Sequence, residues 1–260
     1  MLHAIERKKS PAHRRYTGHR DEHERRVHEE DEITSLVFGT LSLLPDEEGV
    51  AFWLALLDRL KVSEGLRCPE SGLAQQISLW PRLAGTDDDG RAGVEPDMMV
   101  TLSWDAKEGP QSLVLLVEFK WRAPLSGDDQ LQRQWRAAKM KWLGPGNRLL
   151  HLFVGQDLSG AHAARARNDV WSKDPGNSLH ILPWTTVRTL LGEIAASNAK
   201  RPMARWASVV ERFLGSVGIT RFGGFAAVVD KAGPILDVEL AGQVDMKSRI
   251  FWNEHKGQTP

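Results

Sequence analysis

The sequence predicts an α/β domain with a mixed β-sheet flanked by α-helices, and three observations lead to this fold class. Short apolar runs typical of buried strands recur along the chain, with amphipathic segments of helical spacing between them. Two of these runs are joined by a local turn, which favours an antiparallel pair, whereas the later runs alternate with helices. With 260 residues, 41% of them hydrophobic, the chain can bury the core of one domain with appendages.

Composition excludes several classes of protein. Positive and negative charges cancel, so bulk charge does not indicate a nucleic-acid partner, although a basic cleft can lie within a neutral protein. The single cysteine, Cys68, excludes an intramolecular disulfide framework and a multi-cysteine metal site. The apolar stretches are too short to span a bilayer, and the N-terminus lacks the apolar segment of a signal peptide. We therefore expect a soluble cytoplasmic protein without a membrane partner.

The two ends differ in composition from the middle. Residues 1–28 are rich in Arg, Lys, His and Glu and contain little to bury, so we expect a flexible, charged N-terminal tail. Residues 29–221 form the predicted globular domain. Residues 222–260 are a Gly-rich C-terminal extension, which we expect to be partly disordered.

The first part of the domain contains two predicted helices and a strand. Residues 33–44 have apolar side chains all round and end at a proline, which is typical of a mostly buried helix. A second helix is predicted over residues 49–60. Residues 76–83 have the pattern of a strand in which Pro81 favours an edge position or a bend. Residues 85–96 contain the turn formers of a loop.

The second part begins with the two strands that the local turn joins, EPDMMVTL at 95–102 and LVLLVEFKW at 113–121. A helix is predicted over residues 126–144, capped by Ser126 or Asp128 and stopped by a Gly-Pro-Gly sequence. The remaining predicted elements are a strand at 148–155, a helix at 161–171, a strand at 178–184 and helices at 185–197 and 202–217.

Two ionisable residues interrupt the apolar run of the second strand. Because side chains alternate across a strand, Glu118 and Lys120 share one face near its end. Burying an unpaired carboxylate is costly, whereas burying it beside an ammonium or a divalent cation is not. A salt-bridged strand end that emerges into solvent explains the pair as well as a functional site does.

The first strand favours the functional interpretation. Asp97 follows Pro96 at the start of this strand, and an antiparallel register with a local turn brings that start beside the end of the second strand. Asp97 is therefore expected close to Glu118 and Lys120. Two carboxylates and a lysine are suited to bind a hard cation, with the amine positioning or activating a water molecule.

These residues resemble a known family. Pro96-Asp97, followed by Glu118-Phe119-Lys120, looks like the signature of the PD-(D/E)XK nuclease superfamily, and the resemblance covers roughly residues 29–155. It implies a restriction-endonuclease-like core and phosphodiester hydrolysis dependent on Mg²⁺ or Mn²⁺. It also implies that Asp97 and Glu118 hold one or two metal ions. Lys120 would orient the attacking water or stabilise developing negative charge.

Many superfamily members have a helix after the motif that carries a glutamine facing the site. The candidate here is Gln134, on a helix face that it shares with Gln130 and Lys141. Plain helix surface is the alternative explanation for these glutamines. The core stripe of this helix is predicted to consist of Leu131, Trp135, Ala138 and Trp142.

Members of the superfamily also use an acidic residue on the helix before the core sheet. Glu30 is the candidate for this position and a further metal ligand, with Glu29, Asp31 and Glu32 as alternatives. Acids are also favoured in the first turn of a helix because of its dipole, which alone would explain all four.

The resemblance implies a nucleic-acid substrate, DNA in preference to RNA, cut by an endo- or exonuclease in defence against foreign DNA or in DNA repair. The alternatives are a catalytically inactive nuclease-like module that binds DNA or a partner protein, and a scaffold with a plain salt bridge. A homodimer or a partner protein of the same system is compatible with the sequence.

Trp121 is the aromatic residue expected to stack on a nucleotide. Basic residues that would neutralise flanking phosphates, or form a solvated helix face, are Lys107, Arg122, Arg133, Arg136, Lys139 and Lys141.

Overall fold

The computed structural model describes most of the predicted globular domain. The described residues are 29–62, 66, 69, 71–84, 93–107, 109–142, 147–167, 170–171, 179–197 and 201–220. They belong to one compact unit, Met1–Thr220. The predicted tail at 1–28, Cys68, most of the predicted loop at 85–96 and the predicted extension at 222–260 lie outside the described residues. No helix in the described ranges is long and apolar enough to cross a membrane.

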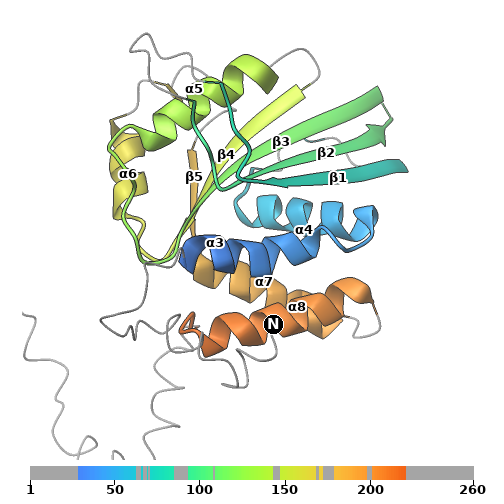
Figure 1. Ribbon diagram of the computed structural model, residues 1–260. Coiled ribbons are helices and arrows are strands. Elements are labelled where there is room, and N and C mark those ends of the chain that lie inside the picture. The colour runs from blue at the N-terminus through green and yellow to red at the C-terminus, as the bar shows by residue number, and fades with distance from the viewer. Residues whose placement is uncertain are drawn as a thin grey trace, which may run out of the picture. The chain divides into compact units, whose positions relative to one another are not determined.

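A five-stranded sheet, with the strand order β1-β2-β3-β4-β5, is the central layer of the domain (Figure 1). Its strands are β1 (Ser71–Leu79), β2 (Met98–Ala106), β3 (Gly109–Lys120), β4 (Asn147–Gly155) and β5 (Leu179–Pro183). The first three strands pair antiparallel, and β3, β4 and β5 pair parallel. This mixed sheet confirms the predicted fold class. β1 begins and ends earlier than predicted, so that Pro81 lies beyond the strand.

Helices cover both faces of the sheet (Figure 1). On one face lie α3 (Glu29–Thr34), its π-helical continuation η1 (Ser35–Gly39), α4 (Asp46–Arg59), α7 (Trp184–Ser197) and α8 (Pro202–Ser216). On the other face lie α5 (Gln130–Trp142) and α6 (Ser159–Ala166). The apolar pattern predicted that the first helix starts at residue 33, but α3 starts earlier. The pattern missed the first turn because that turn consists of acidic residues, which carry no apolar signal. α6 ends before Trp171, short of its predicted end.

β3 lies in the middle of the sheet, and its alternating side chains contribute to two hydrophobic cores. The core on the side of α3, α4, α7 and α8 contains Leu113, Leu115, Val117, Phe119 and Trp121. The core on the side of α5 and α6 contains Val114 and Leu116. On this second side the apolar series of β3 gives way to Glu118 and Lys120, which are buried as well. The strand therefore carries two charged side chains inside the domain, on the one face that the alternation predicted.

Aromatic stacking holds the end of β3 in place. The ring centroid of Phe119 lies 4.7 Å from that of Phe38 in η1 and 5.4 Å from that of Trp184 in α7, and both pairs are stacked. Trp184 also donates a hydrogen bond from Nε1 to the carbonyl oxygen of Lys120 at 3.2 Å. Two helices therefore fix the backbone that carries the charged side chains.

His151 in β4 is fully buried on the α5 side of the sheet. Its ring stacks on Trp135 at a centroid distance of 6.0 Å. Neither ring nitrogen has a hydrogen-bond partner among the described residues. Burial, with a smaller contribution from the charge of His180, lowers the pKa of His151 to about 3. The ring is therefore neutral in the folded protein at neutral pH.

Replacing His151 with Phe is expected to keep the protein folded and to flatten the pH dependence of its stability. The unfolded ring takes up a proton below its ordinary pKa of 6.5, whereas the folded ring does so only near 3. The free energy of unfolding of the wild type therefore falls as the pH drops through this range, with His151 contributing up to about 1.4 kcal/mol per pH unit.

Urea unfolding at a series of pH values between about 7 and 4.5 measures this contribution. His162→Gln, which changes an exposed histidine of α6, is the control. Equal slopes for the wild type and His151→Phe would contradict the assignment of a buried, neutral ring.

Candidate active site

The register of the β2–β3 hairpin brings Asp97 to the end of β3. Met98, the first residue of β2, pairs with Val117. One residue earlier, Oδ2 of Asp97 accepts a hydrogen bond from the backbone N–H of Phe119 at 2.7 Å. Asp97 therefore lies beside Glu118 and Lys120, which is the arrangement that an antiparallel pair with a local turn predicted.

A buried ion pair forms on the α5 side of the end of β3. Nζ of Lys120 lies 2.9 Å from Oε1 of Glu118, and these side chains are only 8% and 1% exposed. Nζ also lies 3.2 Å from Oε1 of Glu30. The other oxygen of Glu30, Oε2, accepts a hydrogen bond from the backbone N–H of Trp121 at 2.9 Å. Glu30 thus joins the site from α3, although it is far from β3 in the sequence.

Asp31, the neighbour of Glu30, makes a different contact. Its Oδ1 accepts a hydrogen bond from Nε1 of Trp80 at 3.2 Å. Trp80 has a φ of 49°, in the left-handed region that a bulky residue adopts at a cost of about 1–3 kcal/mol. Its backbone N–H donates to the carbonyl oxygen of Asp97 at 3.0 Å. Trp80 therefore links the start of α3 to the segment that carries Asp97.

Two glutamines of α5 hold the carboxylate of Glu118. Nε2 of Gln130 donates to Oε1 at 2.6 Å, and Nε2 of Gln134 donates to Oε2 at 2.8 Å. Residues four apart share one face of a helix, so both amides reach the same carboxylate. The sequence assigned a role to Gln134 alone; its spacing from Gln130 was the signal for the second glutamine. Lys141, placed on the same face by the sequence, instead lies exposed with its ammonium over the ring of Trp142.

The site contains three carboxyl groups and one ammonium, and burial makes this imbalance costly. Burial, and then the charge of Glu118, raise the pKa of Asp97 to about 8, against the opposing effects of Lys120 and the Phe119 N–H. Burial also raises the pKa of Glu30, partly offset by Lys120. Burial disfavours the charged form of Lys120, but the carboxylates of Glu118, Asp97 and Glu30 outweigh it and raise the pKa of the ammonium. Lys120 therefore stays protonated, and the raised pKa of Asp97 means that its carboxyl holds a proton at neutral pH unless a cation takes the place of that proton.

The donor set of this site fits a hard divalent cation by its chemistry. Carboxylate oxygens are the ligands that Mg²⁺ prefers, and a cation would take the place of the proton that the raised pKa of Asp97 keeps on its carboxyl. Oδ1 of Asp97, a half-buried residue, has no hydrogen-bond partner within the described part of the chain. The arrangement itself is closed, however. No group of three or more His, Cys, Asp or Glu among the described residues is placed to hold a metal ion. Binding an ion would therefore require Glu118 to exchange one of its present partners.

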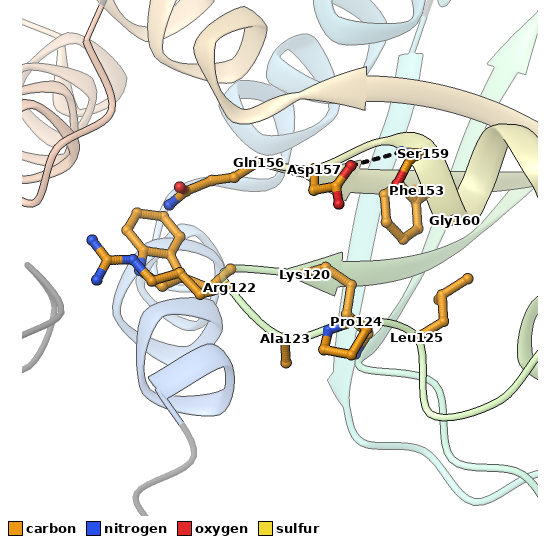
Figure 2. A pocket seen from close by; sticks show the side chains of 11 residues that line it. Lys120, Arg122, Ala123, Pro124, Leu125, Phe153, Gln156, Asp157, Ser159 and Gly160 are labelled. Atoms are coloured by element: carbon orange, nitrogen blue, oxygen red, sulfur yellow. Dashed lines mark hydrogen bonds between the residues drawn. The ribbon is translucent and has the colours of Figure 1, made fainter.

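A cavity of about 480 Å³ adjoins Lys120 at the carboxyl ends of β3 and β4 (Figure 2). It is lined by Lys120, Trp121, Arg122, Ala123, Pro124, Leu125, Phe153, Gln156, Asp157, Ser159 and Gly160. The sequence analysis had singled out Lys120, Trp121 and Arg122 among these residues. The other lining residues gave no functional signal in the sequence. The cavity forms because the chain diverges after two neighbouring parallel strands.

The expectation that Trp121 stacks on a nucleotide is wrong. Its side chain is 1% exposed and packs edge-on against Trp184 at a centroid distance of 5.5 Å. α7 covers the face of the sheet on which Trp121 lies, so the ring is part of the core. Arg122, the next residue, is exposed and remains available to a phosphate.

Comparisons with known proteins give one match among solved structures. The chain is similar to the MspJI restriction endonuclease in complex with a 27-mer oligonucleotide, with 12% sequence identity and a TM-score of 0.27. The match covers 76% of this chain and 40% of that chain. No protein-family model and no curated protein matches the chain. A similarity at this TM-score decides neither fold nor function, which rest on the sheet topology and the site geometry.

Lys120→Met is expected to lower the free energy of unfolding by about 3–5 kcal/mol, because it leaves buried carboxylates without their cation. Adding Glu118→Gln to that variant is expected to restore part of the loss, since it removes one of the unpaired charges. Urea unfolding of both single variants and the double variant measures the coupling. If Lys120→Met is as stable as the wild type, the two side chains do not form a buried pair.

Proposed function

We propose that the chain is a metal-dependent nuclease that hydrolyses phosphodiester bonds, with DNA as its substrate. The observation that carries the proposal is the grouping of one buried lysine with three carboxylic acids at the end of β3, beside an open cavity. Three buried carboxyl groups around one ammonium are costly for a scaffold, and they are suited to bind a cation that also contacts a phosphate of the substrate. The resemblance of these residues to the PD-(D/E)XK signature supports the same activity.

Asp97 and Glu118, with Glu30 as a third acid, would hold Mg²⁺ or Mn²⁺. The bound ion would supply a Lewis acid for the scissile phosphate and lower the pKa of a water molecule. Asp97 already has one oxygen without a hydrogen-bond partner among the described residues. Glu118 is held by side-chain amides, which are neutral donors and can give way to a charged ligand.

Lys120 would act on the phosphate as a charged donor. Its ammonium keeps its proton because three carboxyl groups surround it, so it is not suited to accept one from water. Donating a hydrogen bond to an oxygen on which negative charge develops is the role that such a group can fill. Gln130 and Gln134 orient Glu118 and are positioning residues, whereas Glu30 contacts the ammonium in addition to its proposed part in holding the metal.

The expected setting is the cytoplasm, in defence against foreign DNA or in DNA repair. Either role allows the chain to act as a homodimer or beside a partner protein of the same system. These roles follow by analogy from the superfamily that the motif resembles, because a fold alone does not specify a pathway.

A catalytically inactive module that binds DNA or a protein is the second candidate. One observation favours it: both carboxylate oxygens of Glu118 already accept hydrogen bonds from glutamines. Calorimetric titration with Mn²⁺ separates the candidates. An active site should bind Mn²⁺ in the wild type and lose that binding in Asp97→Asn, whereas a vestigial site should give no heat that depends on Asp97.

The nuclease activity is tested by incubating the purified chain with Mg²⁺ or Mn²⁺ and plasmid, linear duplex or single-stranded DNA, with RNA as a further substrate. Cleavage is expected with metal and absent with a chelator. Asp97→Asn and Lys120→Met should each lower the rate by at least about 100-fold, since each removes a group that acts on the transition state.

Two matched variants control for nonspecific effects. Asp105→Asn changes an exposed acid at the opposite end of β2, and Lys141→Met changes an exposed lysine of α5. Both should cleave like the wild type. Cleavage that survives in both Asp97→Asn and Lys120→Met would refute the assignment of this site.

A further inference from the structure

The cavity beside Lys120 lies where two parallel strands end next to each other. Lys120 at the end of β3 pairs with Gly155 at the end of β4, and the N–H of Gln156 donates to the carbonyl oxygen of Lys120 at 3.3 Å. Beyond this point one segment runs to α5 and the other to α6, and the cavity opens between them (Figure 2). A side chain at residue 155 would not fit, because its Cβ would lie 2.7 Å from the ring of Phe153 and 2.8 Å from the carbonyl oxygen of Asp157.

The lining of the cavity combines three kinds of chemistry. Leu125 and Pro124 from the segment after β3, with Phe153 from β4, supply apolar surface that a flat ring can pack against. Asp157 supplies a carboxylate that the backbone N–H of Ser159 fixes with a hydrogen bond to Oδ1 at 2.9 Å (Figure 2). Gln156, Lys120 and Arg122 add further polar groups on the same cavity.

We infer that this cavity binds one unpaired nucleotide of the substrate strand, next to the phosphate that is cut. The inference rests on the proposed nuclease function. The volume, about 480 Å³, lies in the range of pockets that hold one small molecule, so a single nucleoside fits. The base would pack on the apolar wall, and its amino edge would donate to Asp157. The phosphate would lie at Lys120 and Arg122.

A nucleotide can enter such a cavity only when its base is not paired and stacked within a duplex. Bringing a paired base out of a duplex costs free energy, whereas a single strand offers its bases without that cost. The cavity therefore makes the site selective for single-stranded DNA, or for unpaired positions within a duplex. A carboxylate on the wall also favours bases that carry an amino group over thymine.

The test measures binding apart from cleavage. The Asp97→Asn variant, which keeps every residue of the cavity, is titrated in chelator against a fluorescent single-stranded oligonucleotide and against the same sequence as a duplex. We expect the single strand to bind at least about tenfold more tightly than the duplex, because one base of the single strand can stack on the apolar wall of the cavity. Gly160→Leu, added to this background, places a side chain in the cavity beside Leu125 and should weaken single-strand binding about tenfold.

Ala163→Leu is the matched control, because Ala163 is exposed on the same helix and does not line the cavity. It should bind both substrates like its parent. The inference is overturned if the duplex binds as tightly as the single strand, or if Gly160→Leu leaves single-strand binding unchanged. Cleavage is measured separately, in the chain that keeps Asp97. If that chain cleaves DNA but Gly160→Leu does not weaken single-strand binding, the nucleotide pocket alone is refuted. Single-strand binding without any cleavage refutes the nuclease function instead.

Discussion

The burial of Lys120 beside Glu118 at the end of β3 is the constraint on which the rest of the structure depends. Two charges taken out of water must be paired and hydrogen-bonded, or the domain loses several kcal/mol. Each neighbouring element meets part of this need: α3 through Glu30, the start of β2 through Asp97, and α5 through its two glutamines. These elements are therefore placed as much by the polar cluster as by the hydrophobic cores on either side of the sheet.

The same cluster is unbalanced, and the imbalance connects structure to function. Three carboxyl groups surround one ammonium, and burial raises the pKa of Asp97 to about 8. A divalent cation would relieve this repulsion and replace a neutral amide at Glu118. Under the proposed function, the hydrogen-bonded network would be the metal-free arrangement of the site, and side chains would exchange partners when an ion binds. The cavity adjoins this site through Lys120, so substrate and ion would meet at the same strand end.

The sequence predicted the parts of this site that local geometry determines. The turn between β2 and β3 is short, so the proximity of Asp97 to Glu118 followed from antiparallel pairing, while alternation placed Glu118 and Lys120 on one face. Glu30 could not be separated from its acidic neighbours, because helix-dipole preference explains all of them and only tertiary packing brings Glu30 to Lys120. Trp121 was misassigned since its burial depends on Trp184, a residue far along the chain. The cavity was missed because it forms between segments that only parallel pairing of β3 and β4 brings together.

Crystals of the chain grown or soaked with Mn²⁺, measured for anomalous scattering, would locate an ion bound at the end of β3. We expect an anomalous peak within ligand distance of Asp97 and Glu118, with at least one glutamine amide displaced from the Glu118 carboxylate. Lys120 is expected to stay beside the ion rather than turn to solvent. A structure at saturating Mn²⁺ with no peak at these carboxylates, and with both glutamines still bound to Glu118, would show that the cluster is not a metal site.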